Sequence, residues 1–185
     1  LLYEALELPL PTFAHAPLIL NAEGRKLSKR DGVTSINDFR AMGYTPEAIA
    51  NYMTLLGWSV PEGMEERFSL MEAADVFNFD RVNKAGARFD WDKLNWLNAQ
   101  ILHAWSPQQL LETMTPLWEE RGWTLTQSTE WKLALCELLG PSLTLLSDGV
   151  EQAEPFFACP DLADDAHQQL EVEGARDSLA QLITL

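Results

Sequence analysis

The sequence has 185 residues, of which 46% are hydrophobic and 22% are charged, and its formal net charge is −15. This composition is ordinary for a globular chain of one or two domains. No apolar stretch reaches the roughly 20 residues that a membrane-spanning helix needs, and the overall acidity argues against non-specific binding to nucleic acid.

The first 20 residues predict a short helix and then an extended segment. Residues 1–8 have leucine and alanine at helical spacing, and Pro9 and Pro11 stop this helix. The sequence starts without an initiator methionine or a signal peptide, so we expect a fragment or a processed product. The apolar run at 13–20 predicts a strand or extended segment that leads into a basic loop.

Capping patterns predict helices from Ser35 onward. Ser35 can cap a helix that ends near Met42, with Gly43 beyond it. Thr45 followed by proline starts a second helix, which Gly57 closes. Further helices are predicted from Ser69 to about Phe77, from Asp90 or Asp92 to Leu102, from Ser106 to about Glu120, and over 129–139, 141–147, 162–171 and 175–184. The chain is therefore expected to be mainly helical, with a small α/β remnant at its front.

Positive charge is concentrated in the loop at residues 24–32, which read GRKLSKRDG. Residues 21–40 have five basic against three acidic side chains, whereas residues 106–185 have three against fourteen. Ammonium and guanidinium groups bind phosphate oxygens and stabilise the charge that develops when a nucleotide phosphate reacts. Gly24 and Gly32 would let such a loop close over a substrate and reopen. A solvated basic loop is the alternative on composition alone.

Three motifs, in order, resemble bacterial-type glutamyl-tRNA synthetases, which are class I aminoacyl-tRNA synthetases. Residues 13–32 read FAHAPLILNAEGRKLSKRDG, and residues 26–30 match that family's form of the second class I signature, KMSKS. Residues 43–58, GYTPEAIANYMTLLGW, and 87–98, ARFDWDKLNWLN, are similar to its stem-contact domain. The resemblance is strong over residues 1–105 and rests mainly on helical character over 106–185.

The resemblance implies a mainly α fold in three parts. Residues 1–33 would be the end of a Rossmann-type catalytic domain with the KMSKS-type loop. Residues 34–105 would form a helical stem-contact domain, and residues 106–185 an incomplete helical anticodon-binding domain. Glutaminyl-tRNA synthetase is less favoured, because its anticodon part is a β-barrel whereas residues 106–185 are predicted to be helical.

The activity implied is the ATP-dependent attachment of glutamate to tRNA(Glu) through glutamyl-adenylate. The expected enzyme is a cytoplasmic monomer that uses Mg²⁺ with ATP, contacts no membrane and has no zinc site in this segment. The first class I signature, HIGH, is absent from the sequence, because none of its three histidines is followed by glycine. The chain alone is therefore expected to be inactive. The alternative is a stand-alone, non-catalytic tRNA-binding module derived from this family.

The resemblance also assigns roles to residues by their position. Lys29 would contact the ATP phosphates and stabilise the transition state of adenylate formation, with Lys26 as the second catalytic lysine. Leu18 and Ile19 match a stretch whose backbone lies beside adenine. The expected ATP-binding residues are Leu18, Ile19, Lys26, Leu27, Ser28, Lys29 and Arg30. No metal ligand is predicted.

Outside the loop, three groups of residues have a structural and a functional interpretation. Arg81, Lys84 and Arg88 could grip tRNA phosphates, and a solvated face is the alternative. Most of the tryptophans are expected to pack in the core rather than stack on bases. Cys136 and Cys159 lack the spacing of a metal site, and a buried Cys136 in a reducing compartment is expected.

Overall fold

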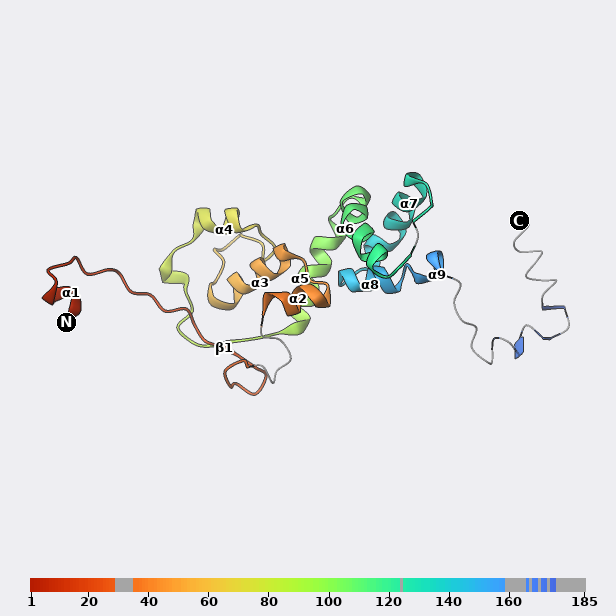
Figure 1. The fold of residues 1–185 in the computed structure, drawn as a ribbon. Coiled ribbons are helices and arrows are strands. Elements are labelled where there is room, and N and C mark those ends of the chain that lie inside the picture. Colours follow the sequence, from red (N-terminus) through yellow and green to blue (C-terminus); the bar gives the residue numbers. More distant parts are fainter. Residues whose placement is uncertain are drawn as a thin grey trace.

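The computed structural model describes residues 1–28, 35–123 and 125–158, together with 166, 168, 169, 171, 172, 174 and 175. These residues are mainly helical, as predicted, and two groups of helices lie side by side beyond an extended N-terminal segment (Figure 1). In chain order, the elements are α1 (Leu2–Ala5), β1 (Ile19–Leu20), α2 (Ile36–Met42), α3 (Pro46–Gly57), α4 (Leu70–Val76), the 3-10 helix η2 (Phe79–Arg81), β2 (Ala87–Arg88), α5 (Trp91–His103), α6 (Pro107–Glu120), α7 (Thr129–Leu139), the 3-10 helix η3 (Gly140–Ser142), α8 (Leu146–Glu151) and α9 (Glu154–Phe157). Within the described part of the chain, no helix is both long and apolar enough to cross a membrane.

The predicted N-caps are confirmed. The side chain of each N-cap residue accepts a hydrogen bond from the backbone N–H group three residues further along the chain. The side chain of Ser35 accepts a hydrogen bond from Asp38 N at the start of α2, and Gly43 ends that helix with φ +95°. The N-caps of α3, α4, α5 and α6 are Thr45, Ser69, Asp90 and Ser106. Such local bonds satisfy the free N–H groups of a helix's first turn, which is why sequence patterns can locate them.

Two predicted elements differ from the structure. The first helix covers only Leu2–Ala5 and is exposed on all sides, whereas the segment at 13–20 is extended, as expected, with strand pairing at Ile19–Leu20 (Figure 1). The helix expected at 141–147 is replaced by η3 and α8, because Asp148 accepts hydrogen bonds from the backbone N–H groups of residues 144 and 145. The helices predicted at 162–171 and 175–184 fall largely outside the described residues.

The helices pack around two main hydrophobic cores that meet on α5. The first core contains Phe39, Tyr44, Ile49, Tyr52, Leu56, Phe89, Leu94 and Leu97. The second contains Leu102, Leu110, Leu111, Met114, Trp118, Leu135, Cys136, Leu139, Leu143 and Ala153. Since α5 contributes Leu97 to one core and Leu102 to the other, this single helix joins the two groups of helices.

Buried side chains in both cores have perturbed ionisation. Tyr52 lies in the first core, its hydroxyl accepts a hydrogen bond from Asp90 N at 2.6 Å, and burial raises its pKa to about 12. The Cys136 thiol is buried in the second core, as predicted, and burial raises its pKa to about 11. Cys159 lies outside the described residues. Trp118 is fully buried as expected, whereas Trp96 is 45% exposed.

Candidate functional site

A narrow turn brings the first half of the basic loop back alongside β1. Asn21 O accepts a hydrogen bond from Gly24 N at 3.0 Å, and Asn21 Oδ1 accepts one from Arg25 N at 2.9 Å. Gly24 has a φ of +76°, a conformation that glycine adopts without strain. Beyond the turn, Leu27 N donates to Ile19 O at 2.9 Å. The segment from residue 26 therefore runs antiparallel to β1.

The other edge of β1 is bound by β2, from far along the chain. Ala87 N donates to Leu18 O at 2.9 Å and Phe89 N donates to Leu20 O at 2.8 Å, which makes the pairing parallel. Gly86 lets β2 approach this closely, because a Cβ atom there would lie 2.7 Å from a Leu20 methyl carbon. The start of the basic loop is thus held on a short, three-segment arrangement of extended chain.

A groove of about 630 Å³ lies beside this arrangement, and we call it the loop groove. It is lined by Pro17, Leu18, Ile19, Lys26, Leu27, Ser28, Ser35, Ile36, Phe39, Met53 and Phe89. Five of the seven predicted ATP-binding residues are in this lining, although residues 18–19 and 26–28 are separated by the turn. Lys29 and Arg30 lie outside the described residues.

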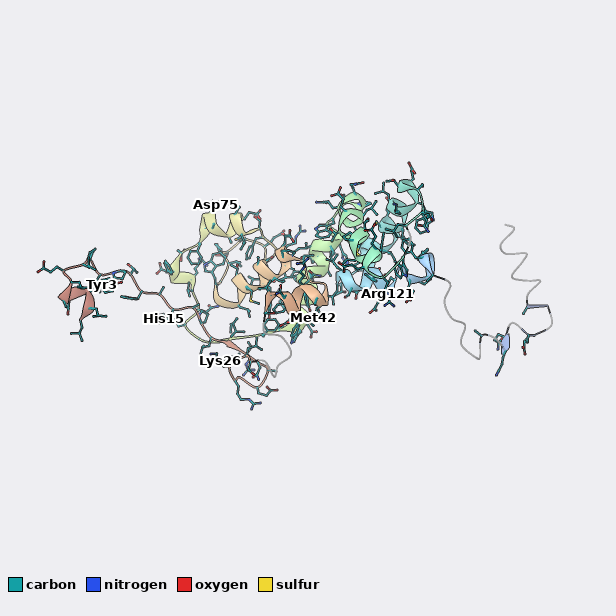
Figure 2. The ribbon with its side chains drawn as sticks, viewed as in Figure 1. Tyr3, His15, Lys26, Met42, Asp75 and Arg121 are labelled. Carbon is teal, nitrogen blue, oxygen red and sulfur yellow. The ribbon has the colours of Figure 1, made fainter. Side chains whose placement is uncertain are left out.

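The described lining of the loop groove is mostly apolar and includes one cationic side chain, that of Lys26. Figure 2 shows Lys26 beside β1, where its side chain is exposed and forms no ion pair with any carboxylate in the described part of the chain. Ser28 adds a hydroxyl group to the same lining. A concave apolar wall with a few polar groups is typical of sites that bind small molecules and cofactors. The neighbouring Arg25 pairs with Glu23 at 3.6 Å on the surface.

Sequence reasoning missed part of the groove wall. Two of the missed residues lie on α2: Ile36 at its exposed start and Phe39 on its buried side. Met53 lies on α3, and Phe89 directly follows β2. Long-range packing brings these residues to the groove, and no local pattern reports it. The capping pattern at Ser35 was the one local indication of this wall, because it predicts that a helix starts shortly after the basic loop and therefore lies near it.

The three predicted tRNA-binding residues lie against different parts of the molecule. Arg81 donates from Nη1 to Val60 O at 3.2 Å and so ties η2 to the loop after α3. Lys84 lines a hollow formed with residues 12–18. Arg88 lies on β2, and its guanidinium group lies close to the turn at Gly24. A Cβ atom built on Gly24 would be 3.9 Å from Arg88 Nη2.

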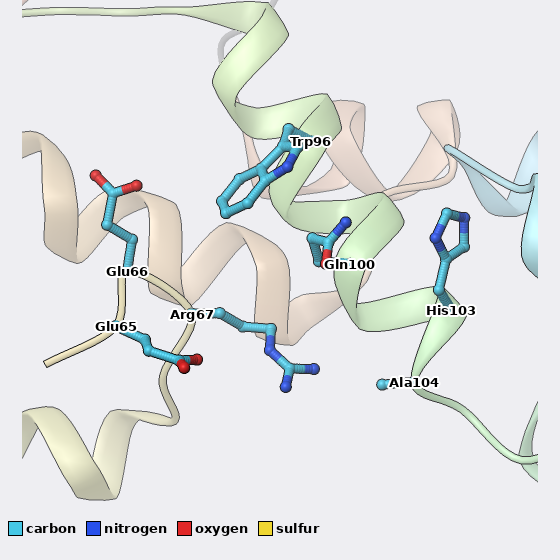
Figure 3. A pocket seen from close by; sticks show the side chains of 7 residues that line it. All are labelled: Glu65, Glu66, Arg67, Trp96, Gln100, His103 and Ala104. Carbon is cyan, nitrogen blue, oxygen red and sulfur yellow. The ribbon is translucent and has the colours of Figure 1, made fainter.

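A second groove, of about 520 Å³, lies between α5 and the loop before α4 (Figure 3). Its lining includes Trp96, Gln100 and His103 from α5 and Glu65, Glu66 and Arg67 from the loop, and the His103 ring is turned away from the loop (Figure 3). Glu66 pairs with Lys93, whose Nζ lies 4.4 Å from the centre of the Trp96 ring. The two carboxylates of this groove are thus balanced by Arg67 and by Lys93, so the groove has no excess of positive charge to attract a polyphosphate. Among the residues described, no three His, Cys, Asp or Glu side chains are grouped so as to hold a metal ion.

Comparisons with known proteins identify the family of the chain. A sequence profile described as "tRNA synthetases class I (E and Q), catalytic domain" matches residues 1–96, just over half of the chain. A glutamate–tRNA ligase of Parasynechococcus marenigrum is 77% identical over 185 residues, which are 100% of this chain and 39% of that protein. A glutamate–tRNA ligase of a Synechococcus strain is 78% identical over 183 residues, covering 99% of this chain and 38% of that protein.

Solved structures show the same relationship. The crystal structure of a glutamate tRNA ligase from Elizabethkingia meningosepticum, in complex with its amino acid, matches with a TM-score of 0.79 and 32% identity. The match covers 98% of this chain and 39% of that chain. This chain thus spans about two fifths of the length of the curated relatives cited above. By the match over residues 1–96, the chain belongs to the family of class I tRNA synthetases for E and Q.

Proposed function

We propose that this chain is the part of a glutamate–tRNA ligase that holds the phosphates of ATP and presents a surface to tRNA(Glu). The observation that supports this most directly is the loop groove, in which residues 18–19 and 26–28 come together as the resemblance implies. Identities of 77–78% to proteins named glutamate–tRNA ligase, over almost every residue of the chain, favour glutamate as the amino acid.

The reaction has two steps, in both of which charge develops on phosphate or acyl oxygens. The glutamate carboxylate attacks the α-phosphate of ATP, and the products are glutamyl-adenylate and pyrophosphate. The terminal ribose hydroxyl of the tRNA then takes the glutamyl group and releases AMP. Fixed cations that contact the phosphates accelerate the first step, because they bind its transition state more tightly than the bound substrates.

In this proposal, different residues of the basic loop and its groove have different roles in binding ATP. The backbone at Leu18 and Ile19 lies beside the adenine ring, Lys29 contacts the phosphates, and Lys26, Ser28 and Arg30 shape and charge the loop around them. Mg²⁺ would arrive with ATP and neutralise charge on its phosphates, and sites of this kind usually supply one or two protein carboxylates beside the phosphate oxygens and water. A group of three or more carboxylates is therefore not required for it.

The tRNA is proposed to lie along the helices that follow the loop. Residues 34–105 would contact the acceptor stem and residues 106–185 the anticodon side. The change of hydrophobic core between Leu97 and Leu102 supports a division near this point. Arg81, Lys84 and Arg88 are the proposed phosphate contacts in the first part. Since residues 106–185 are strongly acidic, their contacts to RNA must be local and specific.

A charging assay tests the proposal. The longer gene product, supplied with ATP, Mg²⁺, glutamate and tRNA(Glu), should attach glutamate to the tRNA, and parallel reactions with tRNA(Gln) define its tRNA specificity. The 185-residue chain alone should show no exchange of pyrophosphate into ATP, even with tRNA present. Exchange by this chain would contradict the need for the HIGH half of the site. No charging by the longer product would contradict the proposal itself.

The alternative of a non-catalytic tRNA-binding module predicts a different gene product. The chain has a mass of 20.9 kDa and corresponds to 39% of a relative's length, so a complete ligase would have a mass of about 54 kDa. The mass of the native product in cell extract, measured by immunoblot, separates these cases. A band near 54 kDa supports the ligase, and a band near 21 kDa supports the module.

A further inference from the structure

The short helix α2 connects the loop groove with the second group of helices. At its beginning, Ser35, Ile36 and Phe39 line the groove. At its end, Met42 and Gly43 contact the first residues of α8 (Figures 1 and 2). Any displacement of the end of α2 by α8 is therefore transmitted to the groove lining, because the helix between them is only seven residues long.

The contact between α2 and α8 satisfies backbone groups at both helix ends. Leu146 N donates a hydrogen bond to Gly43 O at 2.9 Å. The hydroxyl of Ser147 donates to Met42 O at 3.1 Å. The last carbonyls of a helix and the first N–H groups of the next have no partner inside their own helices, so each end supplies what the other lacks.

Gly43 is the residue that allows this contact. Its φ of +95° already favours glycine, and a Cβ atom there would lie 2.7 Å from Ser147 N and 3.0 Å from Leu146 N. Both of those atoms belong to the backbone of α8, so no side chain can rotate away to make room. A larger residue at position 43 must push α2 and α8 apart.

The segment at 143–147 is held from its other side, so it resists such a push. The buried Asn98 of α5 donates from Nδ2 to Thr144 O at 2.6 Å and accepts from Thr45 N at 2.8 Å. His103 Nε2 lies 3.0 Å from Leu143 O, and Asp148 accepts from Leu145 N at 2.8 Å. Asn98 therefore fixes both this segment and Thr45 at the start of α3, so the displacement falls on α2, which ends before Thr45.

We infer that Gly43 is a positioning residue for ATP, which acts through α2 on Ser35, Ile36 and Phe39 in the loop groove. This inference rests on the proposed function, since it assigns the loop groove to ATP. It also makes the second group of helices a determinant of ATP affinity, because α8 sets the position of α2. A 1 Å misplacement caused by a mutation far from the reacting groups can slow a reaction by about 100-fold, so a small shift of α2 is enough to be measured.

The test compares Gly43→Ala with Gly122→Ala in the complete ligase. Gly122 is a matched control, since its φ is +90° and a Cβ atom there meets nothing within 4 Å. Both variants incur the strain of a left-handed alanine, but only Gly43→Ala displaces α2. We expect Gly43→Ala to raise the KM for ATP about tenfold while the KM for glutamate changes less than twofold. Gly122→Ala should change neither the KM for ATP nor the KM for glutamate. If Gly43→Ala and Gly122→Ala both fold and have equal KM values for ATP, the inference is wrong.

Two further measurements keep the test decisive. If Gly43→Ala does not fold, Ser147→Ala removes the bond to Met42 O without a clash, and an unchanged KM for ATP in that variant contradicts the inference. If the wild-type ligase has no activity, the proposed function has failed, and amide hydrogen exchange still tests the link. Exchange over residues 36–42 should be faster in Gly43→Ala than in Gly122→Ala, and equal rates would refute the coupling.

Discussion

Replacing Lys29 with alanine in the complete ligase is expected to lower the rate of adenylate formation by about 100-fold or more. The resemblance places this lysine on the phosphates of ATP, and it follows Ser28, the last described residue of the loop-groove segment. Loss of one fixed donor to a transition-state charge typically costs about 3–4 kcal/mol of barrier. The loss should persist at saturating ATP, because the interaction strengthens in the transition state.

Pyrophosphate exchange, with glutamate and tRNA present, measures this step. Lys132→Ala is the matched control, because it removes the same charge from α7, in the second group of helices. The control should retain nearly the wild-type rate. If Lys29→Ala and Lys132→Ala exchange pyrophosphate equally fast, the role assigned to Lys29 is wrong.

The largest stability effect is expected for Trp118→Ala, at about 3–5 kcal/mol of unfolding free energy. Trp118 is fully buried, its Nε1 donates to Gly149 O at 3.1 Å, and its ring centre lies 5.1 Å from that of Phe157. Truncation removes this aromatic packing, leaves a cavity between α6 and α8, and strands a buried carbonyl. Urea unfolding followed by circular dichroism measures the loss.

Trp96→Ala is the control for this prediction. Trp96 is 45% exposed and contacts Lys93 at the surface, so its truncation should cost less than about 1 kcal/mol. Similar losses in the two variants would mean that the second core is not organised around Trp118. Comparing the unfolding free energies of the two variants thus distinguishes Trp118, which packs in the core, from Trp96, whose ring is partly exposed to solvent.

The helix caps could be predicted from the sequence because their interactions are local. Ser35, Ser69 and Ser106 each bond to a residue three positions ahead, so the pattern and the structure contain the same information. The helix predicted at 141–147 was wrong for a related reason. Apolar periodicity there competes with the Asp148 side chain, which caps the chain at residues 144–145 and delays the helix to Leu146.

The groove could be predicted only in part. Residues 18–19 and 26–28 were identified because a known motif contains them, and the turn at Asn21 brings them together. Phe39, Met53 and Phe89 complete the wall through packing between distant segments. The β2 strand was missed as well, since a strand of two residues exists only through its pairing with β1.

Affinity labelling with an ATP analogue tests the central claim, that the loop groove places ATP phosphates on residues 26–30. An adenosine polyphosphate that ends in a pyridoxal aldehyde forms an imine with a nearby lysine amine and releases water, and borohydride reduction then fixes the bond. In the complete ligase, peptide mapping should find the label on Lys26 or Lys29, and excess ATP should prevent it. Labelling of Lys84, Lys93 or Lys132 instead, or labelling that ATP does not suppress, would contradict the claim.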